Sequence, residues 1–479
     1  MKMSIGGKKC DASDGTKLEV RNPANGKLVD TVPAATSADV EEALIHAREG
    51  LKVWSAVPLH ERARILGDFA RSAEGFRKEI GALVCSEMGK AIGEAEGEVD
   101  SVISLFGGYA EKAKHLYGIT MPVGGDKGME NDLFMTVREP LGVVVCIVPF
   151  NWPVDLFAHK VAPALVMGNS VIVKPALSNP LACIRLVELL HGCGVPANAL
   201  QVLTGSGAKL GAMLSASPKI DAISFTGSTA VGIEIAKAAA ANLTRVFLEL
   251  GGNDPFIVFE DADLEEAADD LVRSRVTNAG QTCCATKRII VQESVRDKLA
   301  ALLVERLRAV KTGAPDDRST KLSCVVGEGA AKEVEAQIAQ TVAEGARCIL
   351  GGKRKGAYLD ATVLVDVTPN MGIAKDLEVF GAVFPFISFR TEEEAIQIAN
   401  ASQYGLQGGI MTRDYPQALR IAMRLQCGGV VINGTGMYRS PEMPFGGYKK
   451  SGIGREGISR TLEELSQEKT IILKNILKA

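Results

Sequence analysis

The stretch LGVVVCIVPFNWP, residues 141–153, joins a run of apolar, mostly β-branched residues to a polar turn. A short run of this kind, closed by a turn, favours a buried β-strand. Helix-length segments separate it and four further runs from one another: SVIVKP at 170–175, ALQVLTG at 199–205, DAISFTG at 221–227 and RVFLELGG at 245–252. Strands that alternate with helices predict an α/β fold with a parallel sheet covered on both faces.

Each of these runs ends in a polar or glycine-rich turn: PFNWP, KPALS, TGSG, FTGST and ELGGN. Parallel strands place their carboxyl ends at the same edge of a sheet, and ligands bind at that edge. We therefore expect a functional site there.

The flanking regions have patterns of their own. Residues 36–115 show helical spacing and open with TSADVEEAL, a capping signature. Residues 122–137 predict an arm of two extended segments. The runs TKRIIVQ, AVFPFISF, GGIMTR and GGVVING lie after Asp254 and predict a second α/β domain. The tail at 468–479, EKTIILKNILKA, predicts a strand that needs a partner, either in the arm or in another subunit.

The composition excludes several classes of protein. The chain has 479 residues, 46% of them hydrophobic, which predicts about three domains. A net charge of −3 and a pI near 6.1 give no reason to expect nucleic acid or an anionic membrane as partner. The polar start lacks the apolar core of a signal peptide, and the ten-residue run at 141–150 is too short to cross a bilayer. We expect a soluble, cytoplasmic protein.

The ten cysteines are scattered and form no CxxC pair, so we expect free thiols and no metal site. The stretch NAGQTCCATK, residues 278–287, holds two of them side by side. A thiol becomes a useful nucleophile when its pKa falls or a base lies nearby. The alternative is that Cys283 and Cys284 are small buried hydrophobic residues.

Other strand ends supply partners for such a thiol. Glu249 ends the run RVFLELGG and could serve as a base, and Asn151 ends another strand at the same edge, where its amide could donate to an oxyanion. A nucleophile, a base and an oxyanion donor are what acyl chemistry requires. The turn FTGSTAVG at 225–232 opens a helix that could hold a phosphate, and Lys174 could reach a ribose or a phosphate.

Over nearly its whole length the sequence resembles the aldehyde dehydrogenase superfamily. The matching stretches, in the order of the family, are PFNWP, GNSVIVKPA, FTGSTAVG, LELGGNDP, NAGQTCC, LEVFG and PFGGYKKSGIGREG. The resemblance implies that Cys283 is the nucleophile, Glu249 the general base and Asn151 the oxyanion donor. It also implies these cofactor contacts: Val148, Pro149, Phe150, Lys174, Ser178, Gly207, Gly227, Ser228, Gly232, Leu250, Glu378 and Phe380.

The implied activity is oxidation of an aldehyde to a carboxylic acid with NAD or NADP. The Cys283 thiolate attacks the carbonyl, a thiohemiacetal loses hydride to the nicotinamide, and Glu249 activates water against the thioester. Two alternatives stay open: a CoA-acylating semialdehyde dehydrogenase, and a family member that has kept binding or structural functions without catalysis.

The resemblance also implies a division into three parts. A Rossmann-like cofactor domain spans 1–117 and 140–251, an α/β catalytic domain spans 252–457, and a small β element for oligomerisation joins 118–139 to 458–479. We expect a homodimer or a homotetramer.

The cofactor preference follows from one departure from the family pattern. Some relatives that prefer NAD have a Glu three residues after the Lys of the KP motif, where this chain has Leu177. No carboxylate is there to repel a 2′-phosphate, so NADP is favoured over NAD. The alternative is that Leu177 only packs and NAD binds through other contacts.

The substrate site that the resemblance implies includes Trp152, His159, Cys284, Arg439 and Phe445. Arg439 could bind a carboxylate, phosphate or sulfonate on a small aldehyde, or could instead lie at a subunit contact. His159 stands where bacterial succinate semialdehyde dehydrogenases tend to have Arg, and could be a buried histidine satisfied by packing. A small polar or anionic aldehyde is expected, such as lactaldehyde or succinate semialdehyde.

Overall fold

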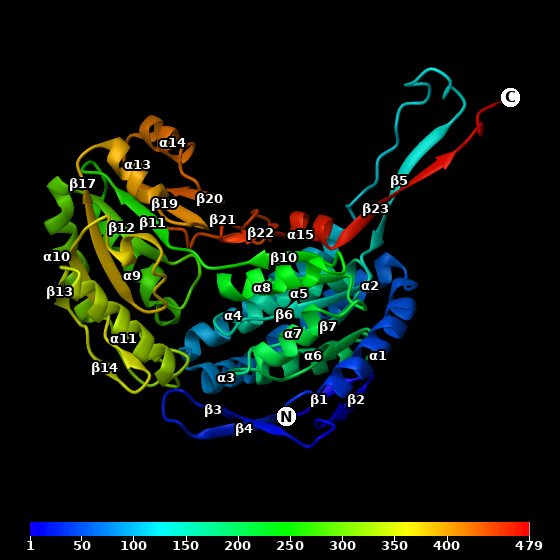
Figure 1. Ribbon diagram of the computed structural model, residues 1–479, viewed down its shortest axis with the longest axis horizontal. Helices are drawn as coiled ribbons and strands as arrows, with labels where there is room; N and C mark the ends of the chain where they lie inside the picture. The colour runs from blue at the N-terminus through cyan, green and yellow to red at the C-terminus, as the bar shows by residue number, and fades with distance from the viewer. Residues whose placement is uncertain (479) are drawn as a thin grey trace.

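The computed structural model describes residues 1–478, and it has two α/β bodies from which a two-stranded ribbon projects (Figure 1). The chain begins with two antiparallel pairs, β1 (Met3–Ile5) with β2 (Lys8–Cys10) and β3 (Lys17–Arg21) with β4 (Leu28–Pro33). The helices expected in 36–115 follow: α1 (Ser37–Ser55), α2 (Leu59–Ser72), α3 (Arg77–Met88) and α4 (Ile92–Ala113). The capping box of α1 is confirmed, because Thr36 and Asp39 each accept from the other's backbone N–H.

The first sheet has eight strands in the order β2-β1-β8-β7-β6-β9-β10-β22. The five strands expected from the sequence form its parallel centre: β6 (Val143–Ile147), β7 (Ser170–Lys174), β8 (Leu200–Val202), β9 (Ala222–Thr226) and β10 (Arg245–Glu249). Between them lie α5 (Pro153–Val166), α6 (Leu181–Gly192), α7 (Ala212–Ser215) and α8 (Thr229–Ala240). The strands are in register, so their carboxyl ends share one edge.

Both faces of this sheet are buried, because successive side chains of a strand point to opposite sides. Val144 and Cys146 of β6 pack into a core that includes residues of α2 to α6. Val143 and Val145 pack into a second core, with residues of α1 and α8. This arrangement explains the unbroken apolar run at 141–150, since a parallel strand covered on both faces has no polar side.

The second sheet has the strand order β13-β16-β17-β12-β11-β19-β20. Its strands are β11 (Asp254–Val258), β12 (Thr286–Gln292), β13 (Arg347–Leu350), β16 (Thr362–Val367), β17 (Val383–Phe389), β19 (Gln407–Met411) and β20 (Gly429–Ile432). Its helices are α9 (Leu264–Val276), α10 (Arg296–Ala309), α11 (Glu328–Ala343), α12 (Gly372–Lys375), α13 (Glu392–Asn400) and α14 (Tyr415–Ala422). Two further pairs are β14 (Arg354–Lys355) with β15 (Tyr358–Leu359) and β18 (Tyr404–Gly405) with β21 (Tyr448–Lys449).

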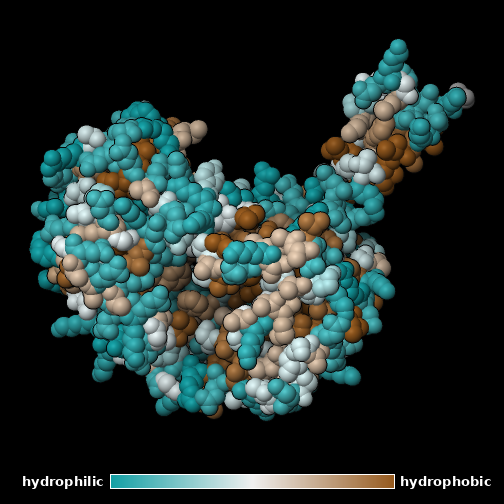
Figure 2. All heavy atoms as spheres, in the orientation of Figure 1, coloured by the Kyte–Doolittle hydropathy of each residue, from teal (hydrophilic) through white to brown (hydrophobic). Residues whose placement is uncertain are grey.

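The projecting ribbon joins distant parts of the chain. β5 (Leu133–Pro140) pairs antiparallel with β23 (Ser466–Leu473) along its whole length. The tail therefore finds its partner in the arm of the same chain, one of the two predicted possibilities. The ribbon extends away from both bodies, and Figure 2 shows hydrophobic residues gathered around its base.

Several strands were not predicted from the sequence. β11 has Pro255 as its second residue, although it lies between β12 and β19. A proline argues against a central strand, and here the pairing with β12 shifts register beside it. β1, β2, β14 and β15 have only two or three residues, and β3, β4 and β13 are mostly exposed or half-buried, so these strands have weak periodicity.

Two short elements pack against a different part of the chain from the one to which the sequence assigned them. β22 (Gly452–Ile453), within the residues expected to be catalytic, pairs with β10 of the first sheet. α15 (Ile458–Glu464), expected with the projecting element, contributes Ile458 and Leu462 to the core beneath the first sheet. The functions assigned to the three parts stay predictions. Within residues 1–478 no helix is both long and apolar enough to cross a membrane.

Candidate functional site

The segment that leads to Cys283 has an unusual backbone. After α9, Asn278 and Ala279 have φ angles of 54° and 53°, and Gly280 follows with a φ of 77°. Left-handed conformations cost a non-glycine residue on the order of 1 kcal/mol or more each, so the surroundings must hold this turn in place. A Cβ on Gly280 would lie 2.4 Å from the Gly381 backbone, which explains the glycine in GQ.

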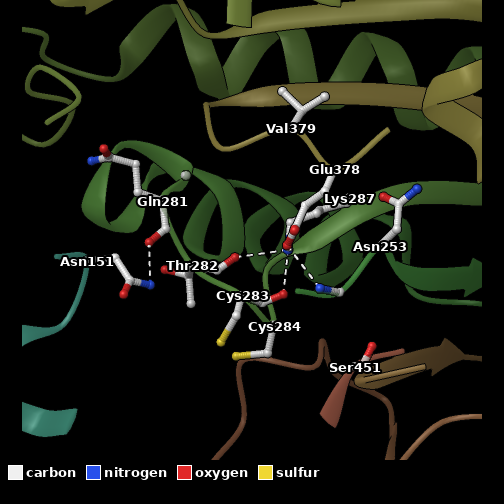
Figure 3. A network of polar contacts seen from close by, with 12 residues as sticks. Asn151, Asn253, Gln281, Thr282, Cys283, Cys284, Lys287, Glu378, Val379 and Ser451 are labelled. Atoms are coloured by element: carbon white, nitrogen blue, oxygen red, sulfur yellow. Dashed lines mark hydrogen bonds and ion pairs between the residues drawn. The ribbon is translucent and has the colours of Figure 1, made fainter. Parts of the chain in front are cut away.

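Buried amides hold the turn. The Asn278 side chain donates to the carbonyl oxygen of Asn151 at 2.8 Å, and the Asn151 amide donates to the carbonyl oxygen of Gln281 at 3.0 Å. The Gln281 side chain donates back to the Asn278 carbonyl and accepts from the Val326 N–H. Asn151 uses one N–H in this way (Figure 3), and the second N–H of its amide has no bond to another residue in 1–478.

The adjacent cysteines differ in exposure. Cys283 is half-buried and Cys284 is buried, with its thiol against the Met437 sulfur at 3.8 Å. The interaction between the two neighbouring thiols favours one thiolate in the pair and opposes the other. It raises the pKa of Cys283, as burial also does, and it lowers the pKa of Cys284. Cys284 also packs with Leu406 and Phe445, so it forms part of the wall beside Cys283.

Glu249 lies at the end of β10 and is buried. Burial raises its pKa well above the ordinary value, and the nearby Glu456 carboxylate and Cys283 raise it further. Its Oε2 has no hydrogen-bond partner among the described residues. Glu249 is therefore a carboxyl that holds its proton strongly and has an oxygen free to accept from water or a thiol.

A second group of charges lies beside this carboxyl. Arg439 donates to Glu456 Oε2 at 2.7 Å, and its Nη2 lies 3.3 Å from His159 Nε2. Lys160 donates to the other Glu456 oxygen at 3.3 Å. Burial alone would raise the pKa of Glu456, but Lys160, His159 and Arg439 outweigh it and lower that pKa. Burial, and then Arg439, lowers the pKa of His159, so the imidazole is neutral near pH 7.

Aromatic residues complete the wall. The Arg439 guanidinium lies over the Phe445 ring at 4.0 Å, and its Nε is buried without a hydrogen-bond partner in the described part of the chain. Trp152 donates to the Thr282 hydroxyl at 3.1 Å, with the Lys90 ammonium 3.8 Å from its ring centre. The five expected substrate residues therefore lie on the segments around Cys283, together with Glu456, a charged residue that was not predicted from the sequence.

The expected cofactor residues follow the carboxyl edge of the first sheet. Val148, Pro149 and Phe150 come directly after β6 and lie beside the end of β7. Lys174 ends β7, where burial lowers its pKa to about 8. Its ammonium has no hydrogen-bond or ion-pair partner in residues 1–478, and a Cβ on Gly207 would lie 3.8 Å from it.

The next turn opens α8. Ser228 is the N-cap of this helix, but its side chain makes no capping bond, so the first N–H groups stay free. Gly227 precedes it. A Cβ on Gly232 would lie 2.5 Å from the Leu250 side chain, so this glycine lets Leu250 pack against α8. Ser178 stands apart from this group: it is exposed and donates to Asn179.

Glu378 and Phe380 reach the edge from the second body. The Phe380 and Phe150 rings lie 6.4 Å apart. Glu378 Oε1 accepts from the Gly252 N–H at 2.9 Å and lies 3.3 Å from the ammonium of Lys287, a buried residue that the sequence analysis did not single out (Figure 3). A hollow with hydrophobic residues faces the viewer between the two bodies in Figure 2.

Comparison with known proteins decides the family. Residues 10–471 match the aldehyde dehydrogenase family. The chain belongs to that family. This confirms the predicted family and α/β fold, and it confirms the protein as an aldehyde dehydrogenase.

Relatives with assigned substrates are similar over almost the whole chain. The 3-sulfolactaldehyde dehydrogenase of Priestia aryabhattai is 37% identical and covers 95% of each chain. The NADP+-dependent succinate-semialdehyde dehydrogenase of Escherichia coli is 36% identical and covers 96% of this chain and 95% of its own. The structure of betaine aldehyde dehydrogenase from Staphylococcus aureus in complex with NAD+ has a TM-score of 0.95 at 33% identity, and covers 100% of this chain and 95% of its own.

Proposed function

We propose that this aldehyde dehydrogenase converts an aldehyde to a carboxylic acid with NADP+ or NAD+, through a thioester on Cys283 that Glu249 helps to hydrolyse. The observation that carries the proposal is the convergence of a half-buried Cys283, the Asn151 amide and the buried Glu249 at one sheet edge. A nucleophile, an oxyanion donor and a base with a raised pKa are the groups that acyl chemistry requires.

The Cys283 thiolate attacks the aldehyde carbon, and the oxygen becomes an oxyanion. The free N–H of Asn151 and the backbone N–H of Cys283 donate to that oxygen. Glu249 can take the thiol proton when it is ionised. A carboxylate whose pKa is raised is a stronger base than an ordinary one. Collapse of the thiohemiacetal releases hydride and leaves the thioester on Cys283.

The carboxyl edge of the first sheet fits a dinucleotide. NADP+ or NAD+ held there would supply the hydride acceptor. The free N–H groups at Ser228 suit a phosphate, and the buried Lys174 ammonium lacks an anionic partner in residues 1–478. Leu177 leaves no carboxylate to repel a 2′-phosphate, so NADP+ is favoured. An NADP+ enzyme and an NAD+ complex both occur among the similar proteins.

Hydrolysis is favoured over transfer to CoA. Glu249 has an unpartnered oxygen and is close enough to Cys283 to interact with its charge, so it can accept a proton from an attacking water. A CoA-acylating enzyme and a non-catalytic family member are the alternatives, and the product distinguishes them from hydrolysis.

Arg439 favours a small anionic aldehyde. One of its nitrogens is bound to Glu456, but Nε is buried without a partner in the described residues, on the Phe445 side of the pocket. A carboxylate or sulfonate would satisfy it. The similar enzymes that act on succinate semialdehyde and sulfolactaldehyde support this substrate class. Lactaldehyde is the small polar alternative.

The ribbon of β5 and β23 favours a homodimer or homotetramer. It exposes the apolar side chains of Ile472 and Leu473, and Ile476 and Leu477 are exposed in the segment that follows it. A cytoplasmic location fits the ten free cysteines, which oxidation would convert to disulfides or acids.

The test is turnover with succinate semialdehyde, lactaldehyde and propionaldehyde, each with NAD+ and with NADP+. We expect carboxylic acid as product whether or not CoA is present, and higher kcat/KM with NADP+. Arg439→Gln should raise KM for succinate semialdehyde about tenfold and leave propionaldehyde nearly unchanged. Arg460→Gln, which alters an exposed pair with Glu463, is the control. Acyl-CoA as the product, or no oxidation at all, would contradict the proposal.

A further inference from the structure

Lys287 is a buried lysine directly beneath the nucleophile segment. It is the second residue of β12, and its side chain is 1% exposed. Its ammonium donates to the carbonyl oxygen of Thr282 at 3.1 Å and to the carbonyl oxygen of Cys283. It also forms the ion pair with Glu378 at 3.3 Å and lies 5.3 Å from the centre of the Phe380 ring. Figure 3 shows these contacts converging on its nitrogen.

These partners use all three donors of the ammonium. Burial of an ammonium costs several kcal/mol unless charges and hydrogen bonds compensate. Burial raises the pKa of Asp254 well above its ordinary value, although the charge of Lys287 opposes that shift, and both Asp254 oxygens lack a hydrogen-bond partner in the described residues. Lys287 is thus directed toward the loop and Glu378 rather than toward the neighbouring carboxyl of Asp254.

Glu378 also contacts the glycine turn that follows Glu249. Its Oε1 accepts from the Gly252 N–H, and a Cβ on Gly251 would lie 2.2 Å from its Oε2. The Glu378 carboxylate therefore contacts the glycine turn on one side and Lys287 on the other. Lys287 therefore links Glu378, an expected cofactor contact, to the backbone of Cys283.

We propose that Lys287 is a positioning residue that couples the Glu378 carboxylate to the nucleophile loop, so that a change at Glu378 alters the reactivity of Cys283. The inference deepens the proposed function, since it rests on Cys283 as nucleophile and Glu378 as a cofactor contact. The positive charge of Lys287 favours the Cys283 thiolate, and Glu378 partly neutralises that charge. A bound cofactor whose ribose hydroxyl donated to Glu378 would weaken this neutralisation.

Other charges also face Cys283 and are held constant in the test. Glu249 approaches from β10, Asp254 from β11 and Arg439 from the loop before Phe445. The neighbouring thiol is the strongest influence on Cys283, so all variants are made in a Cys284→Ala background, which leaves one thiol at the loop.

The experiment measures the rate of alkylation of Cys283 by iodoacetamide against pH, without cofactor or aldehyde. Lys287→Met should raise the apparent pKa and slow alkylation at pH 7 about tenfold. Glu378→Gln should lower the apparent pKa and accelerate alkylation when Lys287 is present, and should have no effect in the Lys287→Met background. Equal effects of Glu378→Gln in both backgrounds would overturn the proposal.

One further variant separates the charge of Lys287 from its hydrogen bonds. Lys287→Gln keeps a donor for the carbonyl groups without the charge, and should shift the pH profile as Lys287→Met does. If Lys287→Met does not fold, this variant and Glu378→Gln complete the test, because Glu378 is partly exposed. An unchanged profile in Glu378→Gln overturns the coupling. Since no turnover is measured, absence of aldehyde oxidation would reject the proposed function without affecting this result.

Discussion

Glu249 is the residue whose chemistry depends most on its surroundings. Burial is the largest cause of its raised pKa, and the Glu456 carboxylate adds to it. At the pH where an ordinary glutamate is ionised, Glu249 is still protonated. Because only the ionised form accepts a proton, its action as a base grows as pH rises through its raised pKa.

We therefore expect kcat to rise with pH above the ordinary range of a glutamate. Glu249→Gln removes the base and should lower kcat about 100-fold or more while flattening this rise. The measurement is kcat against pH for both proteins, with the cofactor and the aldehyde saturating. Parallel profiles for the two proteins would show that another group is the base.

The position of a residue could be predicted from the sequence where its neighbours along the chain reveal it. Asn151 and Glu249 end apolar runs, so a parallel sheet brings them to one edge. Lys287 and Glu456 were missed because their partners are distant in sequence: Glu378 for the first, Arg439 for the second. A lone lysine or glutamate is ordinarily a surface charge, and only packing reveals that these two are buried.

At the scale of elements, α6 depends on a residue from another helix. Its N-cap is Pro180, which offers no side-chain acceptor. The Glu87 carboxylate from α3 accepts instead from the N–H groups of Leu181 and Ala182, at 2.6 and 2.9 Å. Burial raises the pKa of Glu87 to about 8, although these two bonds oppose the shift.

This predicts a pH-dependent stability. Between pH 4.5, the ordinary pKa of a glutamate, and a pH of about 8, the folded state holds a proton on Glu87 that the unfolded state has lost. The contribution of Glu87 to the free energy of unfolding therefore falls as pH rises, by about 1.4 kcal/mol per pH unit at most. Urea midpoints of the wild type and Glu87→Gln at pH 5.5 and 7.5 test this. The wild type should lose more stability than the variant over that interval; equal losses would contradict the pKa.

Elements were predictable where the hydrophobic pattern was strong. β12 has the bounds expected from TKRIIVQ, and the five central strands of the first sheet begin within two residues and end within three residues of their apolar runs. β11 was missed because Pro255 lies in a central strand. β22 has only two residues, and no local pattern could assign it to the first sheet rather than the second.

At the scale of the whole molecule, the projecting ribbon has few contacts with its own bodies. Ile472 is 55% exposed on β23, and exposed apolar strands of this kind mark interfaces between copies. Ile472→Asp should shift the protein to a smaller assembly in light scattering after size exclusion. Val342→Asp on α11, which replaces another exposed apolar residue, should not. An unchanged mass for Ile472→Asp would argue that the ribbon is not the interface.

The central claim is that one sulfur atom, that of Cys283, bonds to the carbonyl carbon of the substrate. The most direct measurement uses Glu249→Gln, in which the thioester should persist, mixed with NADP+ and succinate semialdehyde and digested at low pH. Mass spectrometry of the peptide that contains residues 278–287 should find a succinyl group, and fragmentation should place it on Cys283. An unmodified peptide despite NADPH formation, or the group on Cys284, would contradict the account.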